Sequence, residues 1–247
     1  MYFSLLSMKK ILLNTNTAVR INRRMSELGI ATRNTADELI EKGKVFVNGK
    51  VAQLGMKVRP TDTISIDGSY KKDFSYFAYN KPASVVTVGA SAHEKAVKDV
   101  ADFDVEVFPV GRLDKDSSGL LIMTNDGRVT DKLLNPSKIH EKEYRVMVDK
   151  KITHQFLAKM REGVRISPKE KTKPAKIRRV EENVFDIVLT EGKNRQIRKM
   201  CGSLGYKVQK LERFRIENIE LGNIRPNEHE EISGKTLEEF LTRLGIK

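Results

Sequence analysis

The chain has 247 residues, enough for one large domain or for a large and a small one. Lysine and arginine number 46 against 33 aspartate and glutamate, a formal net charge of +13, and this excess favours a polyanionic partner such as nucleic acid. Hydrophobic residues make up 39% and charged residues 32%, and no apolar run approaches the length that spans a bilayer, which excludes an integral membrane protein.

Residues 1–18 contain several apolar side chains, but Lys9 and Lys10 interrupt them and no small-residue cleavage site follows. We therefore expect a flexible extension there and not a secretory signal. The single cysteine, Cys201, excludes an internal disulfide and fits the reducing cytoplasm. The four histidines lack the spacing of a zinc site, so no metal is expected.

Residues 19–68 predict a small α/β domain. Apolar residues recur at helical spacing in two segments, and the second follows Thr32, a residue type that caps helix N-termini. Strands are expected at 45–47 and 64–66, the first leading into an Asn-Gly hairpin turn at 48–49. The pattern therefore favours two short helices packed on a small sheet.

Basic side chains gather on this first domain. They include Arg20, Arg23, Arg24, Arg33 and Lys44. Basic residues on a solvated helix face are usually only solubilising, so charge alone is weak support for RNA binding. The polar residues 69–75 that follow predict a linker.

Residues 76–247 form the second predicted domain, in which strands and helices alternate irregularly. Strands are expected at 85–88, 105–110, 120–123, 144–148, 185–189 and 207–210, and helices at 94–100, 128–134, 153–160 and 195–203. Several successive strands are close enough in sequence to pair antiparallel. This favours an α+β fold over a doubly wound parallel sheet.

The loop between the strands expected at 105–110 and 120–123 carries a dense set of polar groups. It presents Asp114 beside Arg112 and Lys115 on a glycine-bounded turn, and loops held by rigid strands are where chemistry is usually placed. A solvated turn is the plain alternative. A calcium loop is excluded because its twelfth position would be Asn125 and its flanks are strands.

Four motifs then resemble those of the bacterial rRNA pseudouridine synthases. They are Gly-Arg-Leu-Asp at 111–114 with Ser117 and Gly119, Glu-Lys-Glu-Tyr-Arg-Val at 141–146, Glu-Gly-Lys-Asn-Arg-Gln-Ile-Arg-Lys-Met at 191–200, and Lys-Leu-Glu-Arg at 210–213. The last two are most similar to the branch of large-subunit synthase F, and the first domain resembles an S4 RNA-binding domain. The resemblance spans residues 19–245. It implies a small S4-like domain followed by a mixed, mostly antiparallel sheet with flanking helices and a central cleft.

The resemblance also implies the roles of site residues. Asp114 would be the catalytic carboxylate, and Arg198 would pair with it as the cation that offsets its desolvation. Ile197 would pack beneath the uracil and Tyr144 would stack on it, although core packing is the alternative for a tyrosine on an apolar strand. The reaction that the resemblance implies converts uridine to pseudouridine by breaking the bond between the base and the sugar and rejoining the base through carbon. It imports no group and oxidises nothing, so no cofactor is expected.

The expected partner is RNA. Basic residues of the second domain would track its phosphates, namely Arg112, Lys193, Arg195, Lys199 and Arg213. The favoured substrate is a specific uridine of 23S rRNA, with 16S rRNA or a tRNA anticodon loop as alternatives, and the expected state is a monomer.

Two other functions compete: a non-catalytic RNA-binding or ribosome-assembly factor, and a metal-dependent nuclease using Asp114, Asp116 and Asp126. The nuclease is disfavoured because basic residues surround these aspartates and Asp126-Gly127 predicts a turn. Cys201 follows a basic stretch but is expected to be a buried structural thiol.

Overall fold

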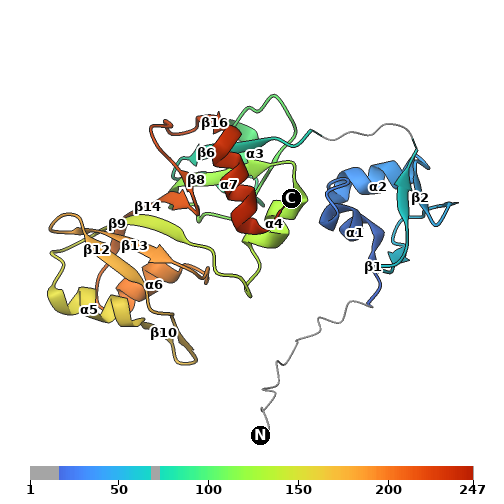
Figure 1. The fold of residues 1–247 in the computed structure, drawn as a ribbon. Helices are drawn as coiled ribbons and strands as arrows, with labels where there is room; N and C mark the ends of the chain where they lie inside the picture. The colour runs from blue at the N-terminus through green and yellow to red at the C-terminus, as the bar shows by residue number, and fades with distance from the viewer. Residues whose placement is uncertain (1–16, 68–72, 247) are drawn as a thin grey trace, which may run out of the picture. The chain divides into compact units, whose positions relative to one another are not determined.

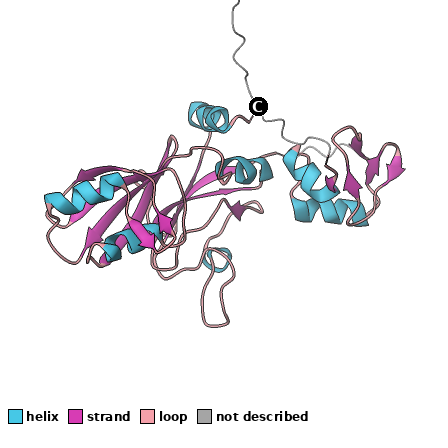
Figure 2. Cartoon of the chain, turned by 90° about the horizontal axis from the view of Figure 1, so that it is seen from below, coloured by secondary structure: helices cyan, strands magenta, loops and turns pink. Residues whose placement is uncertain are grey.

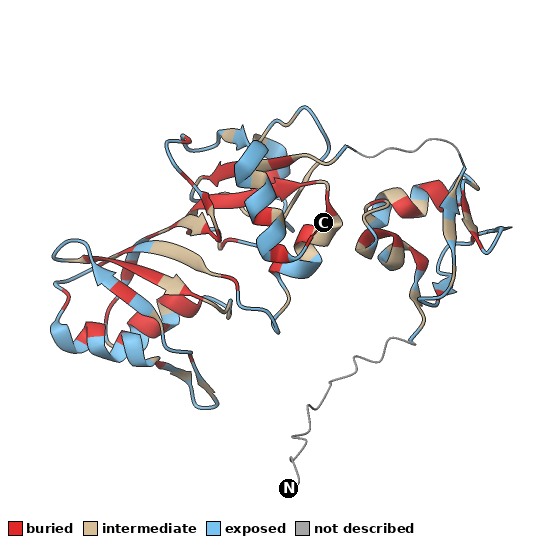
Figure 3. Ribbon diagram, viewed as in Figure 1, coloured by how far each residue is buried: buried red, intermediate tan, exposed pale blue. Residues whose placement is uncertain are grey.

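The computed structural model describes residues 17–67 and 73–246, and the chain divides into two compact units, 1–72 and 73–247. Each unit has its own buried core, shown in red in Figure 3. The division falls within the segment predicted as a linker at 69–75. Most of the extension predicted at 1–18 lies outside the described residues. Within the described ranges, no helix is long and apolar enough to cross a membrane.

The first unit packs two helices on short strands (Figure 1). Its elements are β1 (Val19–Arg20), α1 (Ile21–Glu27), α2 (Arg33–Glu41), β2 (Val45–Val47), β3 (Lys50–Val51), β4 (Lys57–Val58) and β5 (Ile64–Ile66). Thr32 caps α2 as predicted, because its hydroxyl accepts a hydrogen bond from the Thr35 amide (3.1 Å). Asn48 and Gly49 both have positive φ and make the predicted hairpin turn between β2 and β3.

The second unit is organised around one nine-stranded sheet. Its first elements are β6 (Tyr76–Lys81), α3 (Val97–Val100), β7 (Phe108–Pro109), β8 (Ser118–Thr124), α4 (Gly127–Leu133), β9 (Lys142–Val148), α5 (His154–Glu162), β10 (Arg165–Ser167) and β11 (Glu170–Lys171). They are followed by β12 (Lys176–Arg179), β13 (Val184–Leu189), α6 (Gln196–Ser203), β14 (Val208–Ile216), β15 (Ile219–Glu220), β16 (His229–Glu231) and α7 (Gly234–Leu244). The main path of the sheet is β12-β13-β9-β14-β8-β6-β16, with β15 on β14 and β7 on β8.

Strand pairing confirms the predicted mixed, mostly antiparallel sheet. Among the described strands of this sheet, β14 and β8 pair in parallel and the others pair antiparallel. Helices lie against the sheet in the turned view of Figure 2. Helices α5 and α6 cover the half made by β12, β13 and β9, and α4 and α7 pack on the half made by β8 and β6. The parallel β8–β14 pair therefore joins two separately packed halves.

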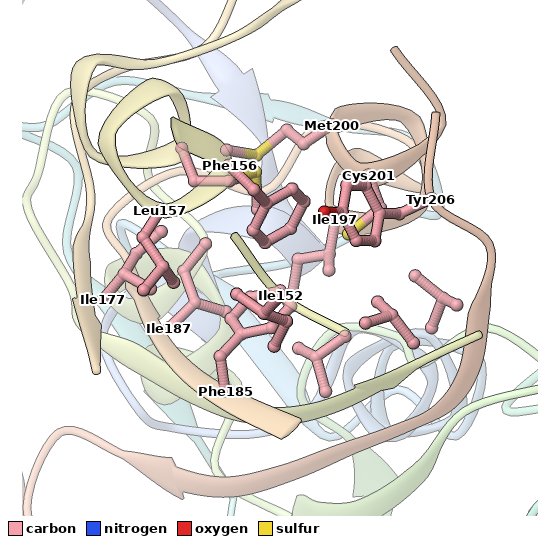
Figure 4. Close-up of a cluster of buried hydrophobic side chains, with 14 of the residues drawn as sticks. Ile152, Phe156, Leu157, Ile177, Phe185, Ile187, Ile197, Met200, Cys201 and Tyr206 are labelled. Carbon is pink, nitrogen blue, oxygen red and sulfur yellow. The ribbon is translucent and has the colours of Figure 1, made fainter. Parts of the chain in front are cut away.

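The core below β9 and β13 is shown in Figure 4. Phe156 and Met160 of α5 and Ile197 and Met200 of α6 are buried there against strand residues such as Phe185. The ring centroids of Phe156 and Phe185 lie 5.5 Å apart in a T-shaped contact. Because α6 is anchored by these buried side chains, the residues at its N-terminus are held in a fixed place beside the sheet.

Some predicted elements are shorter or absent in the structure. The strand predicted at 85–88 is reduced to a single bridge between Val86 and Ala96, and that predicted at 105–110 is reduced to β7, where Pro109 has no N–H to donate to a ladder. The helix predicted at 94–100 begins only at α3, because the Glu94 carboxylate instead closes a turn onto Ser91 (3.1 Å to its amide).

Candidate active site

Residues 111–117 form the loop that leads from β7 into β8. The Ser117 amide donates to the Asp114 carbonyl (3.0 Å) and closes a turn. Just beyond it, Gly119 has a φ of +104°, and a Cβ there would lie 2.2 Å from the Arg213 carbonyl oxygen. Only glycine therefore lets β8 approach β14 where these strands pair in parallel. This close contact fixes where the loop with Asp114 ends.

A buried hydroxyl holds the same loop from the other side. Thr87 Oγ1 donates to the Leu113 carbonyl (2.8 Å) and accepts from the Leu113 amide (3.0 Å), and Thr87 is 2% exposed. Lys115 Nζ also contacts Glu94 Oε1 at 2.9 Å. The segment around Thr87 thus fixes the residues on both sides of Asp114. Sequence reasoning did not find this role, because a threonine in a loop gives no sign of the backbone it will contact.

The Asp114 side chain opens onto a cleft of ≈ 120 Å³. Tyr144 of β9 and Ile197 of α6 line the same cleft, Tyr144 half-buried and Ile197 buried. The structure therefore brings together three of the four residues predicted to act in catalysis. They come from three different elements that are up to 83 residues apart.

The predicted ion pair between Arg198 and Asp114 is not formed. Arg198 Nη2 instead donates to the Asp116 carbonyl (2.9 Å), and its Nη1 donates to the Val208 carbonyl (3.4 Å). The cation nearest to Asp114 is Arg195, whose Nη1 lies 3.7 Å from Asp114 Oδ2 and whose Nη2 lies 3.5 Å from Asp116 Oδ2.

The positions of the two arginines on α6 explain why Arg195, and not Arg198, reaches the Asp114 carboxylate. Arg195 is the N-cap residue, with a left-handed φ of 49°, and it lines the cleft. Arg198 lies one turn further along the helix, and its guanidinium group reaches the backbone of the loop instead of the carboxylate. Arg198 thereby ties the Asp114 loop to the beginning of β14, which makes it a positioning residue in this structure.

A fully buried lysine lies behind the Asp114 loop. Lys81 Nζ donates to the carbonyls of Pro82 and Val85, each at 2.7 Å. Burial lowers the pKa of Lys81 to about 8, and the negative charges of Asp114 and Asp116 oppose that decrease. The lysine is therefore a second source of positive charge near the Asp114 loop. Its Asn-Lys-Pro turn was visible in the sequence, but its burial was not.

The predicted RNA-binding residues fall into separate places. In the first unit Arg20, Arg23 and Arg33 line one pocket of ≈ 370 Å³, Arg23 and Arg24 both contact Glu27 (2.8 and 3.5 Å), and Lys44 is exposed outside that pocket. In the second unit Arg112, Lys193 and Arg195 line the cleft, Lys199 is exposed on α6, and Arg213 is buried beside a larger groove. Each unit thus presents a cationic surface of its own.

Two other residues singled out in the sequence are buried. Cys201 is buried as predicted, and burial raises the pKa of its thiol to about 12. Asp126 is not part of a simple turn: it is the N-cap of α4, its carboxylate accepts from the Arg128 amide (3.0 Å), and Tyr76 donates to it (2.8 Å). Over the described ranges no group of three histidine, cysteine or acidic side chains could hold a metal ion.

Comparison with known proteins agrees with this geometry. Residues 75–203 match the family described as RNA pseudouridylate synthase, and residues 19–64 match the S4 domain. The dual-specificity RNA pseudouridine synthase RluF of Escherichia coli K12 is 41% identical over 227 residues, which cover 90% of this chain and 78% of the relative. The ribosomal large subunit pseudouridine synthase B of Bacillus subtilis is 34% identical, covering 87% of this chain and 92% of the relative.

A solved structure supports the same assignment. A crystal structure described as a pseudouridylate synthase superposes with a TM-score of 0.67 at 25% identity, covering 92% of this chain and 99% of that chain. The sequence matches reach across both units, and the Asp114 cleft lies within the matched second unit. The chain therefore belongs to the RNA pseudouridine synthase family and is an S4-domain isomerase that acts on RNA.

Proposed function

We propose that this enzyme isomerises one uridine of 23S rRNA, as a cytoplasmic monomer, and that Asp114 is its catalytic carboxylate. The observation that carries the proposal is the cleft in which Asp114 faces Tyr144 and Ile197, with cationic side chains along its rim. Two relatives support the choice of RNA: one is named for the ribosomal large subunit, and the other is named for dual specificity. A second RNA, such as a tRNA, is therefore the alternative target.

The reaction breaks the bond between N1 and C1′ of the uridine and joins C1′ to C5, while C5 loses a proton and N1 is left with one. No electron is gained or lost overall. An ionised carboxylate such as Asp114 is the type of group that this reaction requires, whether it attacks the sugar or removes a sugar proton. The Arg195 guanidinium lies 3.7 Å from the Asp114 carboxylate, and the attraction between the two charges strengthens when a bound nucleotide displaces water from the cleft.

The apolar side chains of the cleft suit a base turned out of its helix. The Tyr144 ring offers a stacking surface and Ile197 a buried floor, while Arg198 and Thr87 keep the Asp114 loop in place. Around the base, the arginines of the first unit, Arg112 and Lys193 of the cleft lining, and Lys199 on α6 would contact phosphates and add affinity.

The proposal is tested by mapping pseudouridines in rRNA and tRNA from cells with and without the gene. We expect one 23S rRNA site to disappear on deletion and to return with the wild-type gene but not with Asp114→Asn. Asp116→Asn is the matched control, because Asp116 also contacts Arg195 but is 61% exposed and lies outside the cleft lining. Restoration by Asp114→Asn would contradict the catalytic role. Loss of a site in tRNA or 16S rRNA alone would replace the proposed target.

A further inference from the structure

A second, larger groove adjoins the cleft. It has a volume of ≈ 670 Å³ and shares Arg112, Tyr144 and Lys193 with the lining of the cleft. Its lining includes the cationic side chains of Arg112, Lys138, Lys142, Lys173, Lys193 and Arg213 and, among acidic residues, that of Glu191. The Glu191 carboxylate is already engaged, since its Oε1 accepts from the Gln196 side-chain amide and from the Lys173 amide, each at 2.9 Å. The groove therefore carries an excess of positive charge.

Two of these cations share a face of the sheet with Tyr144. Arg213 of β14 lies directly opposite Tyr144 of β9 in the antiparallel ladder, and paired residues face the same side. Lys142 lies two residues before Tyr144 on β9, so it also faces that side. A separation of two residues along a strand is about 6.6 Å. A nucleotide whose base lies against Tyr144 could therefore place its phosphate near Lys142 and Arg213.

Neither cation has its full set of partners. Arg213 is 3% exposed, and its Nε donates to the Leu120 carbonyl (2.8 Å), but its Nη2 is buried without a hydrogen bond to any described residue. The Lys142 ammonium group has no hydrogen bond or ion pair within the described ranges. Burial, with repulsion from Arg213, lowers the pKa of Lys142 to about 8. The Lys142 ammonium group and Arg213 Nη2 are thus desolvated in the folded chain without a hydrogen bond from a described residue that compensates for it.

The carboxylate that attracts the Lys142 ammonium group is already bound to other partners. Glu217 attracts the Lys142 ammonium group, but its Oε1 contacts His140 Nδ1 at 3.0 Å and accepts from the Glu141 amide at 2.9 Å. Its Oε2 lies 3.7 Å from Arg243 Nη1. The pair of cations in the groove therefore fits an anion supplied from outside the chain.

We propose that Lys142 and Arg213 bind one backbone phosphate of the RNA, next to the uridine held against Tyr144. The inference rests on the proposed function, because it places the substrate in the cleft. A phosphate offers several oxygen acceptors, and a guanidinium and an ammonium group together can satisfy them with charge-assisted hydrogen bonds. Because folding has already removed water from the two cations, phosphate binding does not carry that desolvation cost again, which strengthens binding. Their role is to fix the register of the RNA so that the target base enters the cleft.

The first test measures binding across a salt series, using a stem-loop that the wild-type enzyme modifies. Lys142→Met is expected to weaken binding on the order of tenfold, as for loss of one hydrogen bond between charged groups. The slope of log affinity against log salt should decrease in magnitude by roughly 0.7–0.9. Lys159→Met is the matched control, because Lys159 is exposed on α5 and does not line the groove. It should leave both quantities unchanged.

A second measurement separates phosphate binding from a structural role. Because Lys142→Met removes a desolvated charge, its Tm should stay the same or rise while RNA affinity decreases. An affinity loss with a lower Tm and an unchanged salt slope would show that Lys142 serves only the fold, and would overturn the proposal.

The third test identifies the phosphate. A series of stem-loops, each with one neutral methylphosphonate linkage near the target uridine, is bound to the wild type and to Lys142→Met. At one linkage the neutral substitution should weaken the wild type on the order of tenfold and weaken Lys142→Met clearly less, because only the Arg213 contact to that phosphate remains in the variant. Equal losses in both proteins at every linkage would overturn the proposal. The stem-loop is taken from whichever RNA is modified, so a tRNA or 16S substrate would refute the proposed target without affecting this result.

Discussion

The hydroxyl of Thr87 gives the sharpest prediction about the Asp114 loop. Thr87→Val keeps the shape of the side chain and removes the oxygen that contacts both the amide and the carbonyl of Leu113. Each hydrogen bond is worth about 1 kcal/mol, and a buried backbone group left without a partner costs about 1–3 kcal/mol. Because Leu113 is 7% exposed, water cannot easily replace the lost contacts. We therefore expect the free energy of unfolding to decrease by about 2–4 kcal/mol.

The same change should reduce catalysis beyond its effect on stability. Leu113 directly precedes Asp114, and a displacement of about 1 Å in a catalytic group can lower the rate on the order of a hundredfold. Single-turnover pseudouridine formation, measured well below the Tm of the variant, should slow by about ten- to a hundredfold, with RNA affinity unchanged. Thr87→Ser keeps the hydroxyl and should recover most of the rate.

Thr130→Val is the control for loss of a buried threonine hydroxyl. Thr130 Oγ1 is buried and has no hydrogen bond to any residue in the described ranges, so its removal should leave stability and rate unchanged. If Thr87→Val retained the wild-type single-turnover rate, or if Thr130→Val impaired the enzyme equally, the bracing role of Thr87 would be refuted.

Three further predictions follow from the contacts of the site. Arg198→Met should lower the rate of pseudouridine formation and should lower the free energy of unfolding by about 1–3 kcal/mol. Its stability loss should add to that of Asp114→Asn, because no ion pair joins the two residues, and a clear departure from additivity in denaturant unfolding would contradict this. Residues 73–247 alone should fold, and their RNA affinity should fall less steeply with salt than that of the whole chain, because the arginine pocket of the first unit is missing; equal salt slopes would mean that this pocket contacts no phosphate. Cys201 should resist alkylation by iodoacetamide at pH 8.5 in the native protein and react in denaturant, because a thiol with a pKa of about 12 stays protonated at that pH; rapid native labelling, read by mass spectrometry, would contradict its burial.

Local patterns predicted the elements whose signals lie within a few residues of each other. The Thr32 cap, the Asn48-Gly49 turn and the strand β13 were predicted from neighbouring residue types, because capping, turn and strand signals depend on adjacent residues. Terminal elements such as β16 and α7 were not predicted. The strand β16 has the sequence His-Glu-Glu, which has no strand signature, and it forms by pairing with β6, about 150 residues away.

The sequence by itself determined the family, the reaction class and Asp114 as the candidate carboxylate, because those motifs are short and contiguous. The tertiary structure alone decided which cation faces Asp114. Arg195 and Arg198 are three residues apart on one helix end, and the first contacts the carboxylate while the second contacts the loop backbone. It also decided that Lys81, Arg213 and Lys142 are desolvated. Burial and charge pairing depend on distances between strands remote in sequence, and no local pattern of residue types encodes those distances.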